Sequence, residues 1–283
     1  MLLGLFSAKF SIKKFFLFKF VVLLSICFST IIRTEALQLN ASVHKFISCI
    51  NGKEDYYALI PGKNNTLIVY LHSLSGDFNE PFKSDAESSL ANSLLKEYPA
   101  ASFLSFNYGT SPSWGNAAAR VDITNGLHSV INELNIKTII FVGVSMGAST
   151  ALTYAATAPA DIKNKIVGIV AVSPCANLED LYKQTGSPEI KASLESILGA
   201  GTQSPLIAYQ QNSLDTCVAF LPTTIKVGII SATEDKGVPI ELQKDVARDL
   251  SNRNINVRSY EIEGKFDSLP IKSILEASHF VIQ

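Results

Sequence analysis

Residues 143–147 read Gly-Val-Ser-Met-Gly, a pattern that could serve nucleophilic catalysis through Ser145. An apolar run typical of a β-strand, residues 138–144, leads into the serine, and a run that favours a helix, residues 146–158, follows it. On so sharp a turn the hydroxyl projects beyond the sheet edge, and the two glycines lack the Cβ atoms that would clash in the bend. Unpaired N–H groups at the helix start would stabilise an anion forming on an attacked carbonyl. We therefore predict acyl chemistry at Ser145; the alternative is a pair of helix-packing glycines with an accidental serine.

Strand-like apolar runs alternate with helical patterns along the chain, and this order would position the serine. Two short strand candidates flank an Asn-Gly turn, which predicts an antiparallel pair of strands at the start of the sheet. Continuous apolar runs follow, as expected of strands covered on both faces. Because strands joined through helices pair in parallel with right-handed crossovers, the sequence predicts an α/β fold with a mostly parallel central sheet and helices on both faces. The strand candidates are residues 46–50, 56–60, 67–72, 103–108, 138–144, 167–173, 225–232 and 257–263; the helix candidates are 85–97, 116–134, 146–158, 239–252 and 270 onward.

Residues 176–222 are too long for a simple crossover and carry Gly, Ser and Pro. We predict a helical cap insertion over the strand ends, where it would shape a pocket; the alternative is a peripheral decoration. A length of 283 residues is compatible with one such domain.

Composition and motifs narrow the classes of partner. The formal net charge is −1, so no global field attracts nucleic acid. The sequence shows no metal-ligand spacing, phosphate-cradling loop or dinucleotide fingerprint. We therefore predict no cofactor, no metal and no nucleic-acid partner.

The first 36 residues are typical of a secretory signal peptide. Lysines precede an uncharged apolar run, residues 20–32, and Thr34-Glu35-Ala36 offers a small-residue cleavage site before Leu37. The run is shorter than the roughly 20 residues that span a bilayer, although adding residues 15–18 could make an uncleaved anchor. We expect a secreted or periplasmic domain, residues 37–283; the alternative is a single-pass membrane-anchored protein whose only membrane contact is this segment.

Cleavage would remove Cys27 and leave Cys49, Cys175 and Cys217. Three thiols allow at most one disulfide, so the odd count excludes a disulfide framework. The sequence leaves open which pair, if any, is bonded.

From about Leu39 onward, the chain resembles the α/β-hydrolase fold family, of the serine esterase or lipase type. The resemblance rests on the turn at Ser145 and on Tyr-Leu-His-Ser-Leu at residues 70–74, where the family has a His-Gly oxyanion loop. It implies Ser145 as nucleophile, the backbone N–H groups of Leu74 and Met146 as oxyanion hole, and His72 as a structural residue of the pocket loop. Ser73 replaces the family's usual glycine.

The resemblance also assigns an acid. Asp235 follows the apolar run 225–232 and precedes Val-Pro, as the family's strand-end Asp does, so it would orient an imidazole. Its neighbour Glu234 is the less favoured choice, and a carboxylate stabilised by a helix dipole is the structural alternative.

The base is where the chain departs from the family. Family members carry a His after the last strand, and the equivalent position here is Phe266. His279 alone among the four histidines follows Asp235, so chain order makes it the candidate base, but it lies on the order of 13 Å along the last helix and flanks its buried stripe. His44 and His128 do not point naturally at Ser145, and recruitment of Lys265 or Asp267 is a further alternative.

Two functions therefore remain open. The first is a serine hydrolase of a carboxylic ester or related acyl substrate; the second is a catalytically impaired, hydrolase-like binding protein that lacks the triad His. Tyr108 and Trp114 follow a strand end and would line the pocket mouth, although Trp114 fits a packing role equally well.

Overall fold

Eight strands form one sheet in the order β1-β2-β4-β3-β5-β6-β7-β8. The structure, a computed structural model, describes residues 40–83, 89–108, 112–197, 205–266 and 268–282, so the predicted signal segment lies outside the described residues. β1 and β2 pair antiparallel, β2 pairs antiparallel with β4, and every later pairing is parallel. The strands are β1 (Ser42–Ile47), β2 (Glu54–Ile60), β3 (Thr66–Leu71), β4 (Ser102–Phe106), β5 (Thr138–Val144), β6 (Ile166–Val172), β7 (Lys226–Ala232) and β8 (Asn256–Ile262).

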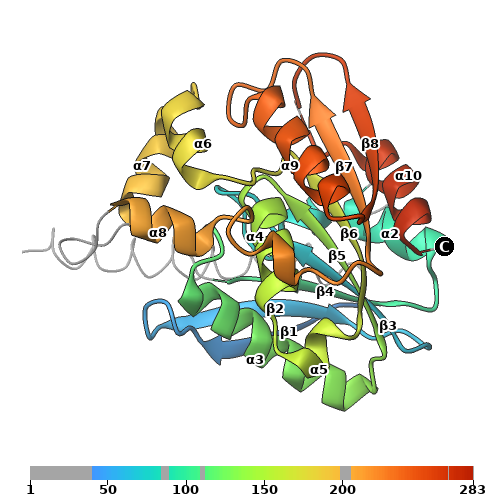
Figure 1. Cartoon of the computed structure of the whole chain (residues 1–283). Coiled ribbons are helices and arrows are strands. Elements are labelled where there is room, and N and C mark those ends of the chain that lie inside the picture. The colour runs from blue at the N-terminus through green and yellow to red at the C-terminus, as the bar shows by residue number, and fades with distance from the viewer. Residues whose placement is uncertain (1–39, 84–88, 109–111, 198–204, 267, 283) are drawn as a thin grey trace, which may run out of the picture.

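Helices cover both faces of the sheet (Figure 1). α3, α4 and α9 contribute buried side chains to one apolar core, and α2 and α10 contribute to the other. The predicted α/β class with a mostly parallel sheet is confirmed. The helices are α2 (Leu90–Glu97), α3 (Ala117–Leu134), α4 (Met146–Thr157), α5 (Ala160–Lys163), α6 (Leu178–Gln184), α7 (Pro188–Ile197), α8 (Pro205–Asn212), α9 (Ile240–Asn252) and α10 (Ile271–Ile282), with 3-10 turns η1 (Glu80–Phe82) and η2 (Val218–Phe220).

The central strands are apolar on both faces because each face meets a helical layer. In β3, Leu67, Val69 and Leu71 belong to one core, while Ile68 and Tyr70 belong to the other. All five are at most 1% exposed. A strand buried in this way reads as a continuous apolar run rather than an alternating one, which is the pattern the sequence carries.

The first strand begins earlier than predicted. It was expected at residues 46–50, whereas β1 ends at Ile47. The reason lies in the turn, since the N–H of Gly52 donates to Ser48 O and the N–H of Ser48 donates to Lys53 O, both at 2.9 Å. The Asn-Gly turn thus takes more residues than a minimal hairpin.

The long segment between β6 and β7 forms α6, α7, α8 and η2, as the prediction of a helical insertion at 176–222 required. Thr185 Oγ1 donates to Gly237 O at 2.6 Å, and the N–H of Gly186 donates to Lys236 O at 2.9 Å. The insertion is therefore fastened to the loop that follows β7.

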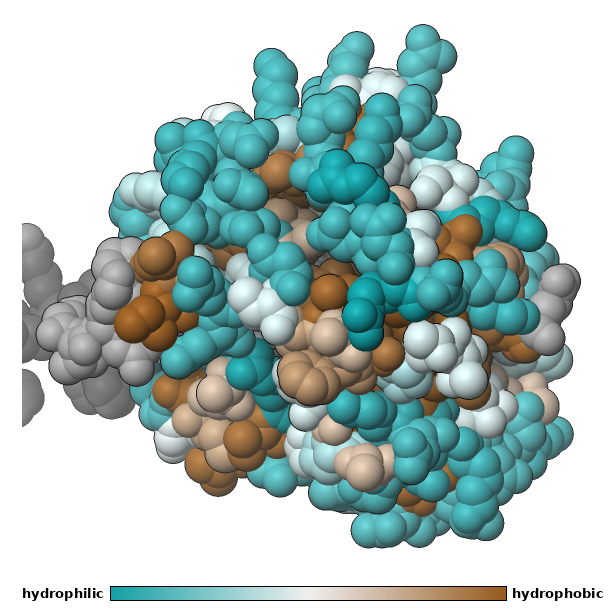
Figure 2. Space-filling model, in the orientation of Figure 1, coloured by the Kyte–Doolittle hydropathy of each residue, from teal (hydrophilic) through white to brown (hydrophobic). Residues whose placement is uncertain are grey.

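The surface seen in Figure 2 is mostly hydrophilic, with apolar side chains in small groups. Cys49, Cys175 and Cys217, the cysteines within the described residues, are all free thiols. Burial raises the pKa of Cys175 to about 12 and that of Cys217 to about 11. In the described part of the chain, no helix combines the length and apolar character needed to span a bilayer. The large apolar side chains that stay exposed are Val43, Ile47, Val121, Val167, Leu206, Ile207 and Phe220.

Candidate functional site

Ser145 lies on a strained turn between β5 and α4. Its backbone has φ 53° and ψ −114°, outside the regions that a non-glycine residue ordinarily occupies. A Cβ atom on Gly143 would lie 2.4 Å from Gly147 O, and one on Gly147 would lie 2.1 Å from Leu71 O, so both positions require glycine. The N–H of Ser145 donates to Val172 O at 2.7 Å and holds the turn against β6. The packing of the sheet thus supports a conformation that the serine alone would avoid.

His72 holds the loop after β3 from within. Its ring is 3% exposed and stacks on Tyr108 with centroids 4.5 Å apart, and its Nδ1 lies 2.7 Å from Ser73 O. Tyr108 donates its hydroxyl to His72 O at 2.5 Å. Burial lowers the pKa of His72 despite the Ser73 carbonyl. These contacts fit a structural role of a neutral imidazole.

Glu80, which the sequence analysis did not single out, organises the same loop. Its Oε2 accepts from the N–H of Ser73 at 2.8 Å and from the Tyr70 hydroxyl at 2.9 Å, while its Oε1 accepts from the Ser73 hydroxyl at 2.6 Å. The serine that replaces the family's glycine is therefore bonded through both its N–H and its hydroxyl. A single carboxylate in a polar loop gave no pattern from which this contact could be predicted.

The predicted oxyanion donors flank this arrangement. Met146 begins α4, so its N–H has no partner within the helix. The N–H of Leu74 makes no hydrogen bond to another described residue. Among the described residues neither N–H group has an acceptor, and their role as an oxyanion hole stays a prediction.

Asp235 lies after β7 and is fully hydrogen-bonded. Its Oδ1 accepts from the N–H groups of Gly237 at 2.8 Å and Val238 at 3.1 Å. Its Oδ2 accepts from the Ser173 hydroxyl at 2.8 Å and from Gln243 Nε2 at 3.3 Å. None of these donors is an imidazole, and the role of Asp235 as the acid stays a prediction.

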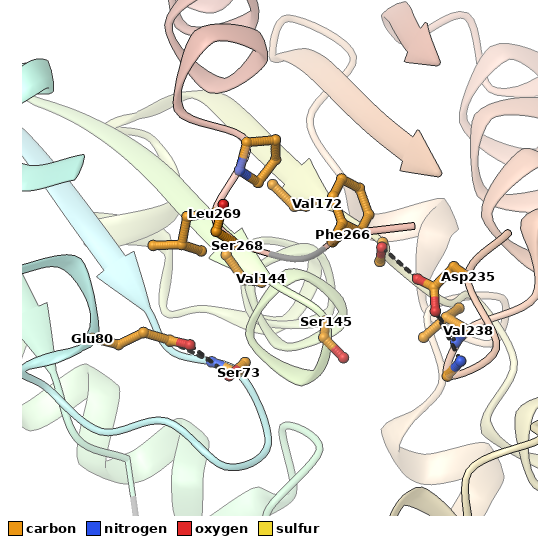
Figure 3. A pocket seen from close by; sticks show the side chains of 13 residues that line it. Ser73, Glu80, Val144, Ser145, Val172, Asp235, Val238, Phe266, Ser268 and Leu269 are labelled. Atoms are coloured by element: carbon orange, nitrogen blue, oxygen red, sulfur yellow. Dashed lines mark hydrogen bonds between the residues drawn. The ribbon is translucent and has the colours of Figure 1, made fainter. Parts of the chain in front are cut away.

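A cavity of about 420 Å³ brings several of these residues together (Figure 3). Ser145 lies between the bonded pair Glu80 and Ser73 on one side and Asp235 on the other. Phe266, the position expected for the family's histidine, lines the same cavity, and no described lining residue is His, Lys or Arg. The lining residues are Ser73, Glu80, Val144, Ser145, Val172, Ser173, Asp235, Gly237, Val238, Phe266, Ser268, Leu269 and Pro270.

The candidate base lies elsewhere. His279 on α10 is half exposed, and its Nε2 lies 2.6 Å from Glu97 Oε1 on α2. His44 stacks on Tyr57. His128 pairs with Asp161. The structure does not bring any described histidine to the cavity wall, and the side chain of Asp267 lies outside the described residues.

The structure buries three residues that the sequence assigned to the pocket and keeps them out of the cavity lining. His72, Tyr108 and Trp114 are 3%, 0% and 0% exposed, and none is among the cavity's lining residues. Trp114 donates its indole N–H to Ser193 Oγ on α7 at 2.9 Å. Its role is therefore the packing alternative, because an indole that joins the core to the insertion has no face left for a ligand.

The chain matches one family model. Residues 66–187 match the model of the alpha/beta hydrolase fold. The sheet order and the turn at Ser145 agree with this match, so the described domain has the α/β-hydrolase fold. A comparison with curated protein sequences found no significant match.

Solved structures show the same fold at low sequence identity. Acylaminoacyl peptidase from Pyrococcus horikoshii aligns with 86% of this chain and 40% of its own, with 12% identity and a TM-score of 0.60. S-formylglutathione hydrolase from Staphylococcus aureus aligns over 86% and 98%, with 15% identity and a TM-score of 0.60. A membrane phospholipase A that is a bacterial virulence factor aligns over 95% of this chain and 98% of its own, with 15% identity and a TM-score of 0.54. This chain thus spans about 40% of the peptidase's length.

Proposed function

We propose that this protein binds a small acyl compound, such as a carboxylic ester or amide, in the cavity beside Ser145 without efficient turnover. The observation that carries the proposal is Phe266 on the cavity wall, with the carboxylate of Asp235 bonded to other donors. A phenyl ring cannot accept the proton of a serine hydroxyl. An oxyanion hole and binding alone keep only about 10³- to 10⁴-fold acceleration over water in a serine hydrolase, so turnover would be poor.

The second candidate is a serine hydrolase with Ser145 as nucleophile. The strained turn favours it, because backbone strain of this kind costs on the order of 1–3 kcal/mol and persists where function uses it. This candidate needs a base from outside the described cavity wall, such as His279 or Asp267. The proposal of catalysis thus rests on the turn and on the two predicted oxyanion donors, but the described cavity wall gives it no base.

Hydrolysis of 4-nitrophenyl butyrate and labelling by a fluorophosphonate separate the two candidates. For a binding protein we expect a slow rate, far below the roughly 10 s⁻¹ typical of enzymes, and little labelling of the folded wild type. Turnover near that typical rate, lost in Ser145→Ala, would establish the hydrolase and overturn the binding proposal.

Binding itself is testable with N-phenylbutanamide, a stable amide, by ligand-observed NMR. Ser268 is exposed and lines the cavity, so Ser268→Trp should fill the mouth and abolish binding at little cost to folding. Ser251→Trp on α9, exposed and outside the cavity, is the matched control and should bind as the wild type does. Equal binding by both variants would place the ligand elsewhere.

The segment 1–36 supports a proposal of export, with Leu37 as the first residue of the mature chain. Mass spectrometry of the protein from its native host would give the mature N-terminus. An intact first segment in the membrane fraction would instead support an anchor.

A further inference from the structure

Ser173 holds a position between the nucleophile candidate and the acid candidate. It follows β6, the strand that lies between β5 and β7, and Ser145 and Asp235 follow those two neighbours. Because parallel strands end at one sheet edge, the three side chains meet there, and all three line the cavity. The N–H of Ser173 donates to Ile230 O at 2.9 Å, which ties the serine to β7.

The hydroxyl of Ser173 takes the oxygen of Asp235 that would orient an imidazole. Backbone N–H groups occupy Oδ1, so Oδ2 is the acceptor left for a side chain. Ser173 donates to Oδ2 at 2.8 Å and is 3% exposed. A hydrogen bond to the half-buried carboxylate of Asp235 is charge-assisted and stronger than a neutral one, and an imidazole N–H would have to displace it.

The backbone conformation of Ser173 is also unusual for a serine. Its φ is 49°, in the left-handed region that favours glycine. A serine held there retains its hydroxyl at a conformational cost, and the bond to Asp235 is the contact that this hydroxyl makes. A glycine at this position would relieve the backbone and leave Oδ2 with only the longer side-chain bond from Gln243 Nε2, at 3.3 Å.

We propose that Ser173 and Phe266 together take the place of the imidazole in a Ser-His-Asp site, so that the cavity is a latent acyl-transfer site. Phe266 supplies the ring volume on the cavity wall, and Ser173 is a positioning residue that supplies the hydrogen bond to Asp235 Oδ2. This inference rests on the proposed function. It implies that a histidine at position 266 acts well only when the Ser173 hydroxyl is also removed.

With both substitutions, the protein would hydrolyse an ester in two steps. The Ser145 Oγ attacks the carbonyl carbon of 4-nitrophenyl butyrate, and its proton passes to the imidazole introduced at position 266. The imidazolium gives this proton to the leaving oxygen as the ester C–O bond breaks, so that 4-nitrophenol leaves and the imidazole is neutral again. Water then attacks the acyl carbon and gives a proton to the imidazole. Butyric acid leaves as Ser145 Oγ regains the proton. Asp235 stays ionised throughout and orients the imidazole N–H.

The test compares kcat/KM for 4-nitrophenyl butyrate in Phe266→His, in Phe266→His with Ser173→Gly, and in Phe266→His with Ser251→Gly. We expect the Ser173→Gly double variant to exceed the wild type by about 10²- to 10⁴-fold, the range of general base catalysis. Its rate should rise with pH through about 6.5, the ordinary pKa of histidine. The control variant, Phe266→His with Ser251→Gly, changes an exposed serine on α9. Its kcat/KM should equal that of Phe266→His alone.

Three outcomes would overturn the proposal. They are equal activity of Phe266→His with and without Ser173→Gly, activity that survives addition of Ser145→Ala, and a folded double variant that binds N-phenylbutanamide yet stays at the wild-type rate. Should Ser173→Gly prevent folding, Phe266→His with Ser173→Ala removes the same hydroxyl and is read in the same way. Rapid turnover by the wild type would refute the proposed function instead, so the two failures are distinguishable.

Discussion

At the scale of single residues, the site is defined by the close approach of backbone at Ser145. Gly147 faces Leu71 O across a gap that no Cβ atom fits, and Gly143 faces Gly147 in the same way. Short approaches between backbone atoms cannot be relieved by a rotamer change. The glycine pattern around the serine is therefore a steric requirement, whatever the chemistry of the hydroxyl.

Gly147→Ala should destabilise the protein by about 3 kcal/mol or more, the upper range for overpacking, because its Cβ would meet backbone rather than a flexible side chain. Urea unfolding measures the loss. Gly52→Ala is the control: its φ is 68° but nothing lies within 4 Å of the added Cβ, so only the left-handed strain of about 1 kcal/mol applies. An equal loss in the free energy of unfolding for both variants would show that the backbone around Gly147 moves to accommodate the added Cβ.

His72 makes stability depend on pH. Burial lowers the pKa of its imidazole in the folded state below the unfolded value of about 6.5, so the unfolded chain binds the proton more tightly. The free energy of unfolding should therefore fall as pH decreases from about 7 toward the lowered pKa, by up to about 1.4 kcal/mol per pH unit. His72→Gln should reduce this slope.

The slope is measured by urea unfolding at several pH values above the carboxylate range. His128→Gln, at a half-exposed histidine on α3, is the control for replacing a histidine outside the core. A slope in His72→Gln as steep as in His128→Gln would mean that a different group carries the pH dependence.

At the scale of elements, a buried side-chain bond joins the insertion to the core. Trp114 precedes α3 and donates to Ser193 on α7, and both residues are buried. Other contacts run from α6 to the loop after β7 through Thr185 and Gly186. The insertion is thus fixed from two directions while its described residues stay out of the cavity lining.

Ser193→Ala would leave the buried indole N–H of Trp114 without its acceptor. We expect a loss of about 1–3 kcal/mol, the cost of an unpaired buried donor, seen by thermal or urea unfolding. Ser196→Ala changes an exposed serine of the same helix and should stay within about 0.5 kcal/mol of the wild type. A loss at Ser193 no larger than at Ser196 would mean that water satisfies the indole.

At the scale of the whole molecule, a nearly neutral chain encloses an acidic cavity. The formal net charge is −1, yet Glu80 and Asp235 both line the cavity and no described lining residue is a cation. A cleft lined by charges of one sign concentrates the electrostatic field of those charges. The charge of a ligand should therefore affect binding more than the overall charge of the protein suggests.

We expect the neutral N-phenylbutanamide to bind at least about tenfold more tightly than the monoanion N-phenylsuccinamate, a difference of about 1.4 kcal/mol. Titration at low and high salt measures both affinities, and screening should narrow the gap. Glu80→Gln should narrow it as well, while Glu97→Gln on α2, outside the cavity, should not. Tighter binding of the anion would contradict this account.

The signals that the sequence carried on its own are local ones. The apolar runs predicted the parallel sheet because strands covered on both faces must be apolar throughout, and Gly-Val-Ser-Met-Gly predicted the turn because its constraint lies within five adjacent residues. Asp235 was placed after β7 in the same way. The sequence also shows directly that Phe266, and not a histidine, occupies the position after the last strand.

The tertiary structure alone decided which groups touch these residues. Ser173 and Asp235 are 62 positions apart, and Trp114 and Ser193 are 79 apart. Neither pair forms a pattern of period or spacing, since the sheet edge and the packing of α7 create both contacts. Hydrogen bonds of this kind depend on distances of about 3 Å that only the packed chain sets. For that reason the turn could be foreseen, whereas the partner of the carboxylate could not.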